Sequence, residues 1–237
     1  MLQDGTLAKA KKYLDLHFPE NQKLFPRPKS DPSPTVTISR ETGTGADRVF
    51  ESVISLLQQH QLEFTYFDKT LINKIIESQN IPERFAQYLE EDRSHPIQEM
   101  IQEMLGMHPP TGVLLRKANE AILSLAMLGN VILVGRGSTI IAGKLNNALH
   151  FRLIGPVELR VKNMMYYYDM QEKDARAFIK KEDAARRDYV KHHYGKDPDD
   201  SNLYHAIINL GQCSIDDAAS IIAAMVLEKR KLLIKSR

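Results

Sequence analysis

Residues 35–50 read TVTISRETGTGADRVF, and this stretch indicates the class of fold. Residues 35–39 form a short run rich in β-branched side chains, which predicts a strand. Gly43 and Gly45 follow, and residues 49–59 carry apolar side chains at helical spacing. A strand, a glycine-containing turn and a helix in this order are typical of α/β domains. Glycines let the backbone turn tightly, and the free amides at the start of the helix attract an anion.

The rest of the chain repeats this alternation of strand and helix. Further short strands are predicted at residues 64–67, 130–134, 150–154 and 206–209. Helices are predicted at residues 49–59, 70–79, 82–92, 95–105, 111–128, 156–165, 171–194 and 214–235. Most of the strands are continuously apolar, which predicts an α/β fold with a parallel sheet covered by helices on both faces. Because ligands of such sheets bind beyond the carboxyl ends of strands, functional residues are expected in the loops that follow the strands.

The composition is that of an ordinary globular protein. The chain has 237 residues and a formal net charge of +2, which excludes a protein that coats a polyanion by bulk charge. The lack of an aromatic and basic stripe argues against nucleic-acid binding. No apolar run approaches the roughly 20 residues of a membrane span, and the first residues show no signal-peptide core. Cys213 is the only cysteine, so no disulfide forms within the chain, and a reducing, cytoplasmic location is expected.

Two regions are expected along the chain. Residues 1–34 are predicted to form a leader helix and a proline-rich linker, because four of the eleven prolines lie at positions 26, 28, 32 and 34. The compact domain is expected at residues 35–237, which is long enough to bury a core without disulfide bonds.

The turn at residues 40–46 is a candidate phosphate-binding loop. Its match to the pattern G-x-x-x-x-G-K-[ST] is incomplete, since Arg40 stands at the first glycine position, Ala46 at the lysine position and Asp47 at the hydroxyl position. Positive charge must then come from other side chains, of which Arg40 and Arg48 are the nearest. The alternative is an ordinary turn between a strand and a helix, and the motif alone does not separate the two.

Two other strand ends carry candidate residues. Gly135 and Gly137 flank Arg136 at the end of the strand at 130–134. An arginine is hard to pack there but suits a phosphate, because its planar fork donates two parallel hydrogen bonds. Asp68 follows the strand at 64–67, and it either caps the next helix or lies at an acceptor pocket.

Residues 180–197 (KKEDAARRDYVKHHYGKD) form a charged helical segment that contains Arg186 and Arg187. Acidic residues and Tyr189 are interleaved with the basic ones, and apolar positions are sparse, which favours a lid that grips phosphate. The alternative, commoner for a run of charge, is a solvated helix face. No pattern such as H-E-x-x-H, C-x-x-C or G-x-S-x-G indicates a metal site or a nucleophile.

Taken in order, six segments of the chain resemble the cytidylate kinase-like family of P-loop proteins. They are TISRETGTGADRV, YFDKTLI, NVILVGRGS, FRLIGPVELRV, KKEDAARRDYVKHHYGKD and SNLYHAIINLGQCSIDDAA, and they cover about residues 35–225. The resemblance implies a P-loop kinase-like parallel sheet flanked by helices, with a helical insertion on the acceptor side and a lid.

The resemblance also implies roles for single residues. The loop that binds the donor nucleotide would comprise Arg40, Glu41, Thr42, Gly43, Thr44, Gly45, Ala46 and Arg48. Substrate binding would involve Asp68, Arg136 and Asp188, and catalysis Arg136, Arg186 and Arg187, with Lys191 a weaker match. ATP and Mg²⁺ are the implied cofactors, and Glu41 or Asp47 would hold the metal ion.

The expected function is nucleotide-binding phosphotransfer, from ATP to CMP, another nucleoside monophosphate or another small acceptor. Ala46 replaces the loop lysine of true cytidylate kinases, so arginines would have to stabilise the transferred group. The alternative is a non-catalytic nucleotide or anion sensor with a degenerate P-loop. In either case the expected partners are nucleotides and small molecules, not nucleic acid or membrane.

Overall fold

The computed structural model describes residues 33–68 and 113–236, together with Lys12. The helices predicted at 70–79, 82–92 and 95–105 lie outside the described residues, as does most of the predicted leader and linker. The helical insertion implied by the resemblance falls on the same undescribed stretch.

The described part of the chain is built around a five-stranded sheet. Its strands are β1 (Thr35–Arg40), β2 (Thr65–Phe67), β3 (Val131–Val134), β4 (Ala148–Ile154) and β5 (Ala206–Asn209). They lie in the order β2-β3-β1-β4-β5, and every neighbouring pair is parallel. The prediction of a parallel α/β sheet is therefore confirmed. Because all strands run the same way, their carboxyl ends meet at one edge of the sheet.

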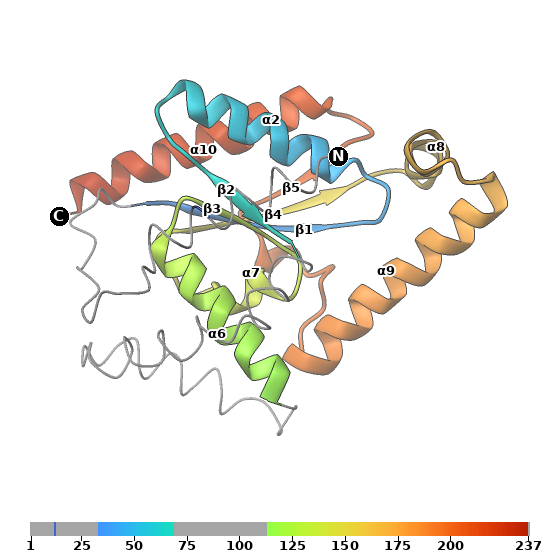
Figure 1. Ribbon diagram of the computed structural model, residues 1–237, viewed down its shortest axis with the longest axis horizontal. Coiled ribbons are helices and arrows are strands. Elements are labelled where there is room, and N and C mark those ends of the chain that lie inside the picture. The colour runs from blue at the N-terminus through green and yellow to red at the C-terminus, as the bar shows by residue number, and fades with distance from the viewer. Residues whose placement is uncertain (1–11, 13–32, 69–112, 237) are drawn as a thin grey trace.

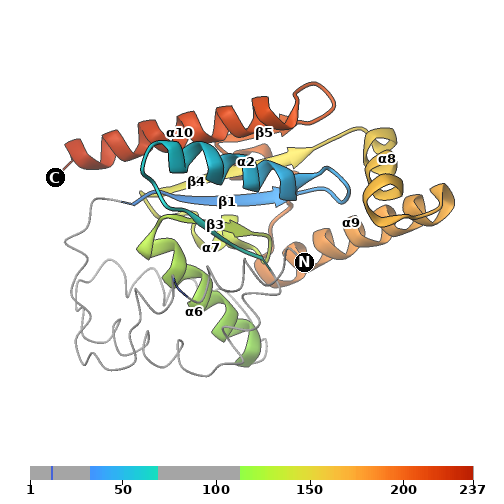
Figure 2. The same ribbon diagram turned by 45° about the horizontal axis from the view of Figure 1, so that its top comes forward.

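Helices cover both faces of the sheet (Figures 1 and 2). One face carries α2 (Ala46–Gln59) and α10 (Ile215–Lys235), and the other carries α6 (Val113–Leu128) and α7 (Ser138–Ile141). Two more helices, α8 (Val157–Tyr168) and α9 (Glu172–Tyr194), follow β4 and lie beyond the carboxyl edge. A 3-10 turn (Ser201–Leu203) leads into β5. None of the described helices is long and apolar enough to cross a membrane.

An apolar core fills each face of the sheet. Val36 and Ile38 of β1 are fully buried in the core beneath α2 and α10. Side chains alternate along a strand, so Thr35 faces α6, where its hydroxyl donates to the Ala126 carbonyl at 2.7 Å. Burying one large aliphatic side chain contributes about 1.5–3 kcal/mol. These two cores hold β1 and β3 in place, and with them the loops that follow.

The predicted and observed elements differ mainly at their ends. β4 begins at Ala148 rather than at residue 150, whereas α2 begins at Ala46, directly after the glycine-containing turn as expected. The four-residue helix α7 was not predicted, because one turn is too short to show a helical pattern. Its start at Ser138 directly follows the Gly135–Arg136–Gly137 turn, which places that turn at the carboxyl edge.

Candidate functional site

A cavity of about 350 Å³ opens at the carboxyl edge of the sheet. Its walls come from the end of β1, the turn between β3 and α7, the middle of α9 and the segment that precedes β5. The rule for parallel sheets therefore predicted the position of the cavity correctly.

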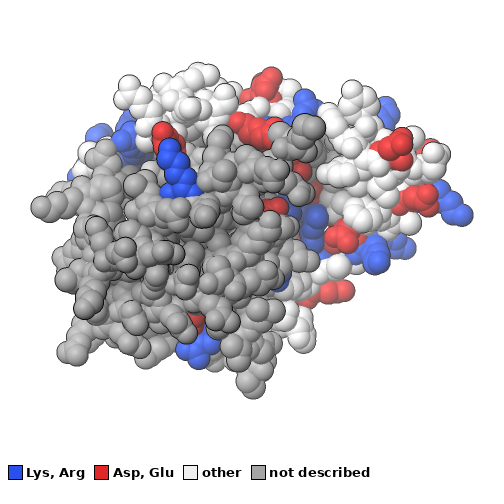
Figure 3. Space-filling view, viewed as in Figure 1, with Lys and Arg blue, Asp and Glu red and all other residues white. Residues whose placement is uncertain are grey.

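Arginines dominate the charge of this cavity. Five guanidinium groups line it, those of Arg40, Arg136, Arg152, Arg186 and Arg187. Three carboxylates, Glu41, Glu182 and Asp183, lie on the same walls. Burial, together with the neighbouring charge of Arg186, lowers the pKa of Arg40 to about 10. On the face shown in Figure 3, by contrast, acidic and basic side chains are interspersed over α8 and α9. The visible surface over α8 and α9 therefore carries mixed charge, whereas the cavity carries more guanidinium groups than carboxylates.

The turn that carries Arg136 has an unusual backbone. Arg136 has a φ of 54°, and Gly135 and Gly137 on either side have φ values of 73° and 72°. A positive φ costs energy in a residue with a side chain and is often found at functional sites. The Arg136 carbonyl accepts a hydrogen bond from the hydroxyl of Tyr194 at 3.1 Å, and its guanidinium lies over the ring of Tyr189. The end of α9 thereby fixes both the backbone and the side chain of Arg136.

The loop between β1 and α2 packs against α8. Gly43 and Gly45 both have a φ of 80°, and a Cβ at Gly43 would come within 2.7 Å of the Arg160 carbonyl. The Gly43 carbonyl accepts a hydrogen bond from the Asn163 side chain at 2.7 Å. At the start of the loop, a Glu41 carboxylate oxygen accepts from the Gly155 amide at 2.9 Å. The loop is therefore a tight turn whose shape depends on glycine at position 43.

Asp183 of α9 reaches into this loop. One of its carboxylate oxygens accepts from the Thr42 amide at 2.8 Å and from the Thr42 hydroxyl at 2.7 Å. The other accepts from the guanidinium of Arg160 at 2.5 Å. Arg186 donates to the same Thr42 hydroxyl at 2.8 Å. Loop and α9 are thus joined at this point by three hydrogen bonds.

A second ion-pair network forms the far wall. Arg152 projects from the middle of β4, is 8% exposed and donates to the hydroxyl of Ser39 at 2.9 Å. The carboxylate of Asp199 binds both Arg152 and Arg187. Asp199 therefore ties the segment before β5 to β4 and to α9.

The structure brings together some of the predicted site residues. Arg40, Glu41, Arg136, Arg186 and Arg187 line the cavity. Thr42, Gly43, Thr44, Gly45 and Ala46 form the adjoining loop and first helical residue, and the side chains of Thr42, Thr44 and Ala46 are buried.

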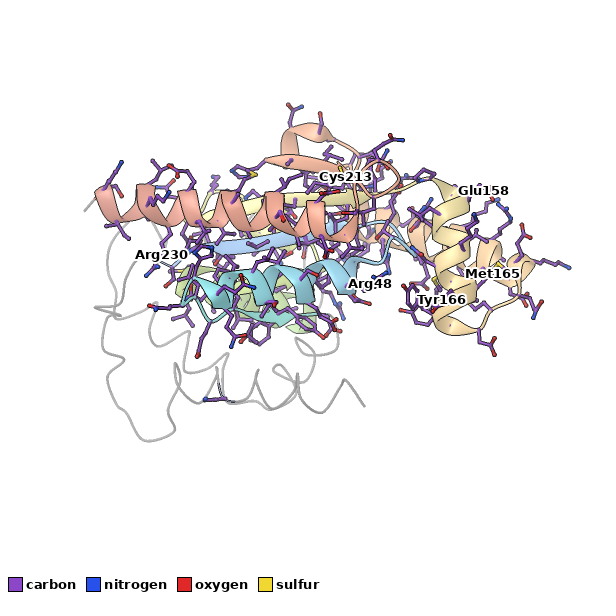
Figure 4. All side chains as sticks on the ribbon, turned by 90° about the horizontal axis from the view of Figure 1, so that it is seen from above. Arg48, Glu158, Met165, Tyr166, Cys213 and Arg230 are labelled. Atoms are coloured by element: carbon purple, nitrogen blue, oxygen red, sulfur yellow. The ribbon has the colours of Figure 1, made fainter. Side chains whose placement is uncertain are left out.

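Other predicted residues lie elsewhere. Arg48 is exposed and donates to the Tyr167 hydroxyl at 2.6 Å, at the end of α2 nearest α8, as Figure 4 shows. Asp188 is exposed on α9, and Lys191 pairs with Asp197 at 3.0 Å. Asp68 ends β2. None of these four is among the described residues that line the cavity.

Sequence reasoning did not single out Arg152, Asp183 or Asp199 as site residues. Arg152 has a recognisable signal, because an arginine inside the apolar strand HFRLI must find a buried partner. Asp183 and Asp199 have no such signal. Each stands in a charged run, and the sequence does not show which acidic residue of the run faces the site.

The described residues contain no group of three or more histidine, cysteine or acidic side chains placed to bind a metal ion. This does not conflict with Mg²⁺, which commonly takes one or two carboxylates and completes its shell with phosphate oxygens and water.

Comparisons with known proteins give one family match and two structural alignments. The model of the cytidylate kinase-like family matches residues 35–212. The crystal structure of an uncharacterized protein from Eubacterium ventriosum ATCC 27560 is similar over 83% of this chain and 99% of that one, with a TM-score of 0.64 and 19% identity. A gluconokinase from Sinorhizobium meliloti 1021 aligns over 87% of this chain and 97% of its own, with a TM-score of 0.40 and 11% identity. No curated protein matches the chain.

Proposed function

The chain belongs to the cytidylate kinase-like family, and from this membership we propose that it transfers a phosphoryl group from ATP to a nucleoside monophosphate or another small acceptor. The family match confirms the resemblance that the six sequence segments indicate. The observation that carries the proposal is the convergence of five guanidinium groups in one cavity at the carboxyl edge of a parallel sheet.

The loop at residues 41–46 is the proposed site of the donor phosphates. Its glycines allow a tight turn with positive φ values, and α2 begins directly after it at Ala46. Amides at a helix start attract phosphate oxygens. Ala46 offers no ammonium group, whereas the guanidinium of Arg160 is buried beside Thr42 and donates to its carbonyl.

The arginine-lined cavity is the proposed site of the acceptor and of the transferred group. Phosphoryl transfer demands that negative charge on the equatorial oxygens be stabilised while the two reacting oxygens are held in line. Arg136, Arg186 and Arg187 reach the cavity from two different elements, so they can contact the transferred group from more than one side. The reaction makes a bond from an acceptor oxygen to phosphorus and breaks the bond to the leaving nucleoside diphosphate.

Glu41 is the residue that best fits a Mg²⁺ ion. Its carboxylate lies on the cavity wall beside the loop, whereas Asp47 is exposed on α2 and is not among the described residues that line the cavity. When bound, Mg²⁺ would neutralise part of the charge on the phosphate oxygens. The remaining stabilisation would come from the guanidinium groups.

A thermal-shift screen against nucleotides, with and without Mg²⁺, tests the binding half of the proposal. A ligand that binds the folded protein raises the melting temperature by mass action. We expect shifts with nucleoside triphosphates that increase with Mg²⁺. If no nucleotide shifts the melting temperature at millimolar concentration, the proposed function is wrong.

A transfer assay separates an enzyme from a sensor. The alternative of a non-catalytic nucleotide or anion sensor is favoured by one observation, the absence of a lysine at position 46 of the loop. Radiolabelled ATP is incubated with a panel of nucleoside monophosphates and sugar phosphates, and label transfer is measured. Turnover with any acceptor supports the kinase, whereas binding without turnover supports the sensor.

A further inference from the structure

The carboxylate of Asp183 occupies a position in the β1–α2 loop that has the donors of an anion site. It accepts hydrogen bonds from a backbone amide and a hydroxyl, both of Thr42, and from the guanidinium of Arg160. Three donors that converge on two oxygens are also what binds a phosphoryl group. The acid comes from α9, 141 residues away along the chain from Thr42.

More hydrogen-bond donors surround this position than the Asp183 carboxylate accepts from. Arg160 is 6% exposed, and its Nε has no hydrogen-bond partner among the described residues. The Glu41 carboxylate oxygen lies 3.7 Å from that nitrogen, beyond hydrogen-bond distance. Arg186 lies 4.0 Å from the Asp183 carboxylate and also donates to Thr42. A buried N–H without a partner costs free energy, and a tetrahedral anion has more acceptor oxygens than Asp183.

The middle of α9, which contacts the loop, is not anchored in an apolar core. Ala175 and Ile179 anchor one end of α9 in a small apolar core with α8, and Tyr194 anchors the other end beneath α7. None of the side chains between Ile179 and Tyr189 is buried. The middle of the helix is therefore held to the loop by polar contacts, which an anion of higher charge can replace.

We propose that Asp183 is an internal competitor for the donor phosphate: its carboxylate holds the loop closed, and a phosphoryl group binds by displacing it. This inference rests on the proposed function and adds a regulatory step to the same site. Displacement frees Arg160 for the phosphoryl group and releases the middle of α9, so occupancy of the loop is transmitted to Arg186 and Arg187 in the cavity.

The ionisation of Asp183 suits this role. Burial acts to raise the pKa of Asp183, but hydrogen bonds from Thr42 and the charge of Arg160 outweigh it and hold that pKa below its usual range. The carboxylate is therefore charged at neutral pH. Its side chain is 24% exposed and lines the cavity, so it has a route out of the loop.

Binding of inorganic tripolyphosphate to wild-type protein and to Asp183→Asn, measured by isothermal titration calorimetry, tests the inference. The asparagine amide cannot form the ion pair with Arg160. The variant should therefore bind tripolyphosphate at least about tenfold more tightly than the wild type does. Asp174→Asn is the matched control, since Asp174 is an exposed acid in the first turn of the same helix. That control should bind as the wild type does.

Each outcome decides between the proposals. If the wild type binds and Asp183→Asn binds equally or more weakly, the competitor role is wrong while the proposed function stands. If neither protein binds tripolyphosphate, the competitor role is wrong, and the thermal-shift screen against nucleotides decides the proposed function separately. Should the variant not fold, the ¹³C carboxyl NMR signal of Asp183 in the wild type gives the answer. We expect this signal to move as tripolyphosphate binds, because the carboxylate loses its donors, and an unchanged signal in the bound protein overturns the inference.

Discussion

The guanidinium of Arg136 lies over the aromatic ring of Tyr189, with 5.7 Å between its Cζ atom and the ring centroid. Arg136 comes from the turn after β3 and Tyr189 from α9, so the contact joins a rigid edge of the sheet to the helix that covers the cavity. A cation over a ring face is stabilised by the ring's quadrupole, and the ring also limits the directions in which the guanidinium can turn.

Replacement of Arg136 by lysine should weaken phosphate binding. An ammonium group is a single point of charge and cannot donate two parallel hydrogen bonds to a phosphate. We expect affinity for tripolyphosphate to fall about tenfold or more, in line with the loss of a hydrogen bond to a charged group. Calorimetry measures the change. The same substitution at Arg230, on α10, is the control, and equal losses in the two variants would contradict a specific role for Arg136.

Gly137→Ala should destabilise the fold. A Cβ at this position would lie 2.3 Å from the ring of Tyr194, and the φ of 72° is unfavourable for any residue with a side chain. Overpacking and backbone strain together should lower the free energy of unfolding by about 3 kcal/mol, as measured by urea denaturation.

Gly195→Ala separates the two causes. Gly195 has a φ of 61°, but nothing lies within 4 Å of its would-be Cβ. Only the backbone cost applies there, so we expect a loss of about 1 kcal/mol. If both variants lose the same free energy of unfolding, the contact between a Cβ at position 137 and Tyr194 does not contribute to the loss.

His150 should make stability fall in mild acid. Burial is the main cause that lowers the pKa of His150 from 6.5 to about 4, with a smaller effect of His205. Between pH 6.5 and pH 4 the unfolded chain takes up a proton that folded His150 does not, so stability is full above pH 6.5 and is lost as pH falls toward 4. The contribution is on the order of 3 kcal/mol at most.

His150→Asn removes this titration. His150 Nδ1 lies 2.8 Å from the Thr37 hydroxyl, and asparagine can keep a hydrogen bond to that group. Urea unfolding between pH 7 and pH 4.5 should show a shallower decline in the variant than in the wild type. Parallel curves would mean that groups present in both proteins account for the whole effect, namely the acidic residues and His205, whose pKa is also lowered by burial.

The sheet and the position of the cavity could be predicted because both depend on local signals. Continuous apolar runs mark buried strands, and in a parallel sheet the loops after those strands must share an edge. Arg40 and Arg136 were found in this way, since Arg40 ends β1 and Arg136 lies two residues after β3. Their roles in binding remain predictions that the experiments above test.

Pairings across long stretches of chain could not be predicted. The acidic residue that enters the loop is Asp183 and not the exposed Asp188, and both stand in the same charged segment. The choice between them depends on how α9 is rotated about its axis, which is set by Ala175 and Ile179 against α8 and by Tyr194 beneath α7. The sequence of this charged segment does not reveal how the helix is rotated, because a wide apolar face would be needed to show which side points to the core.

Arg152 and Asp199 should respond unequally to substitution. Asp199→Asn leaves a guanidinium that is 8% exposed without a charged partner, whereas Arg152→Met leaves a carboxylate whose side chain is 46% exposed and still paired with Arg187. An unpaired buried charge costs more than a solvated one, so we expect losses of unfolding free energy of about 2 kcal/mol for Asp199→Asn and at most about 1 kcal/mol for Arg152→Met.

Urea denaturation of both variants and of the double variant measures the difference. The double variant should be more stable than Asp199→Asn alone, because the methionine removes the buried charge that the asparagine leaves unpaired. If it is less stable than either single variant, Arg152 contributes through packing and not through its pairing with Asp199.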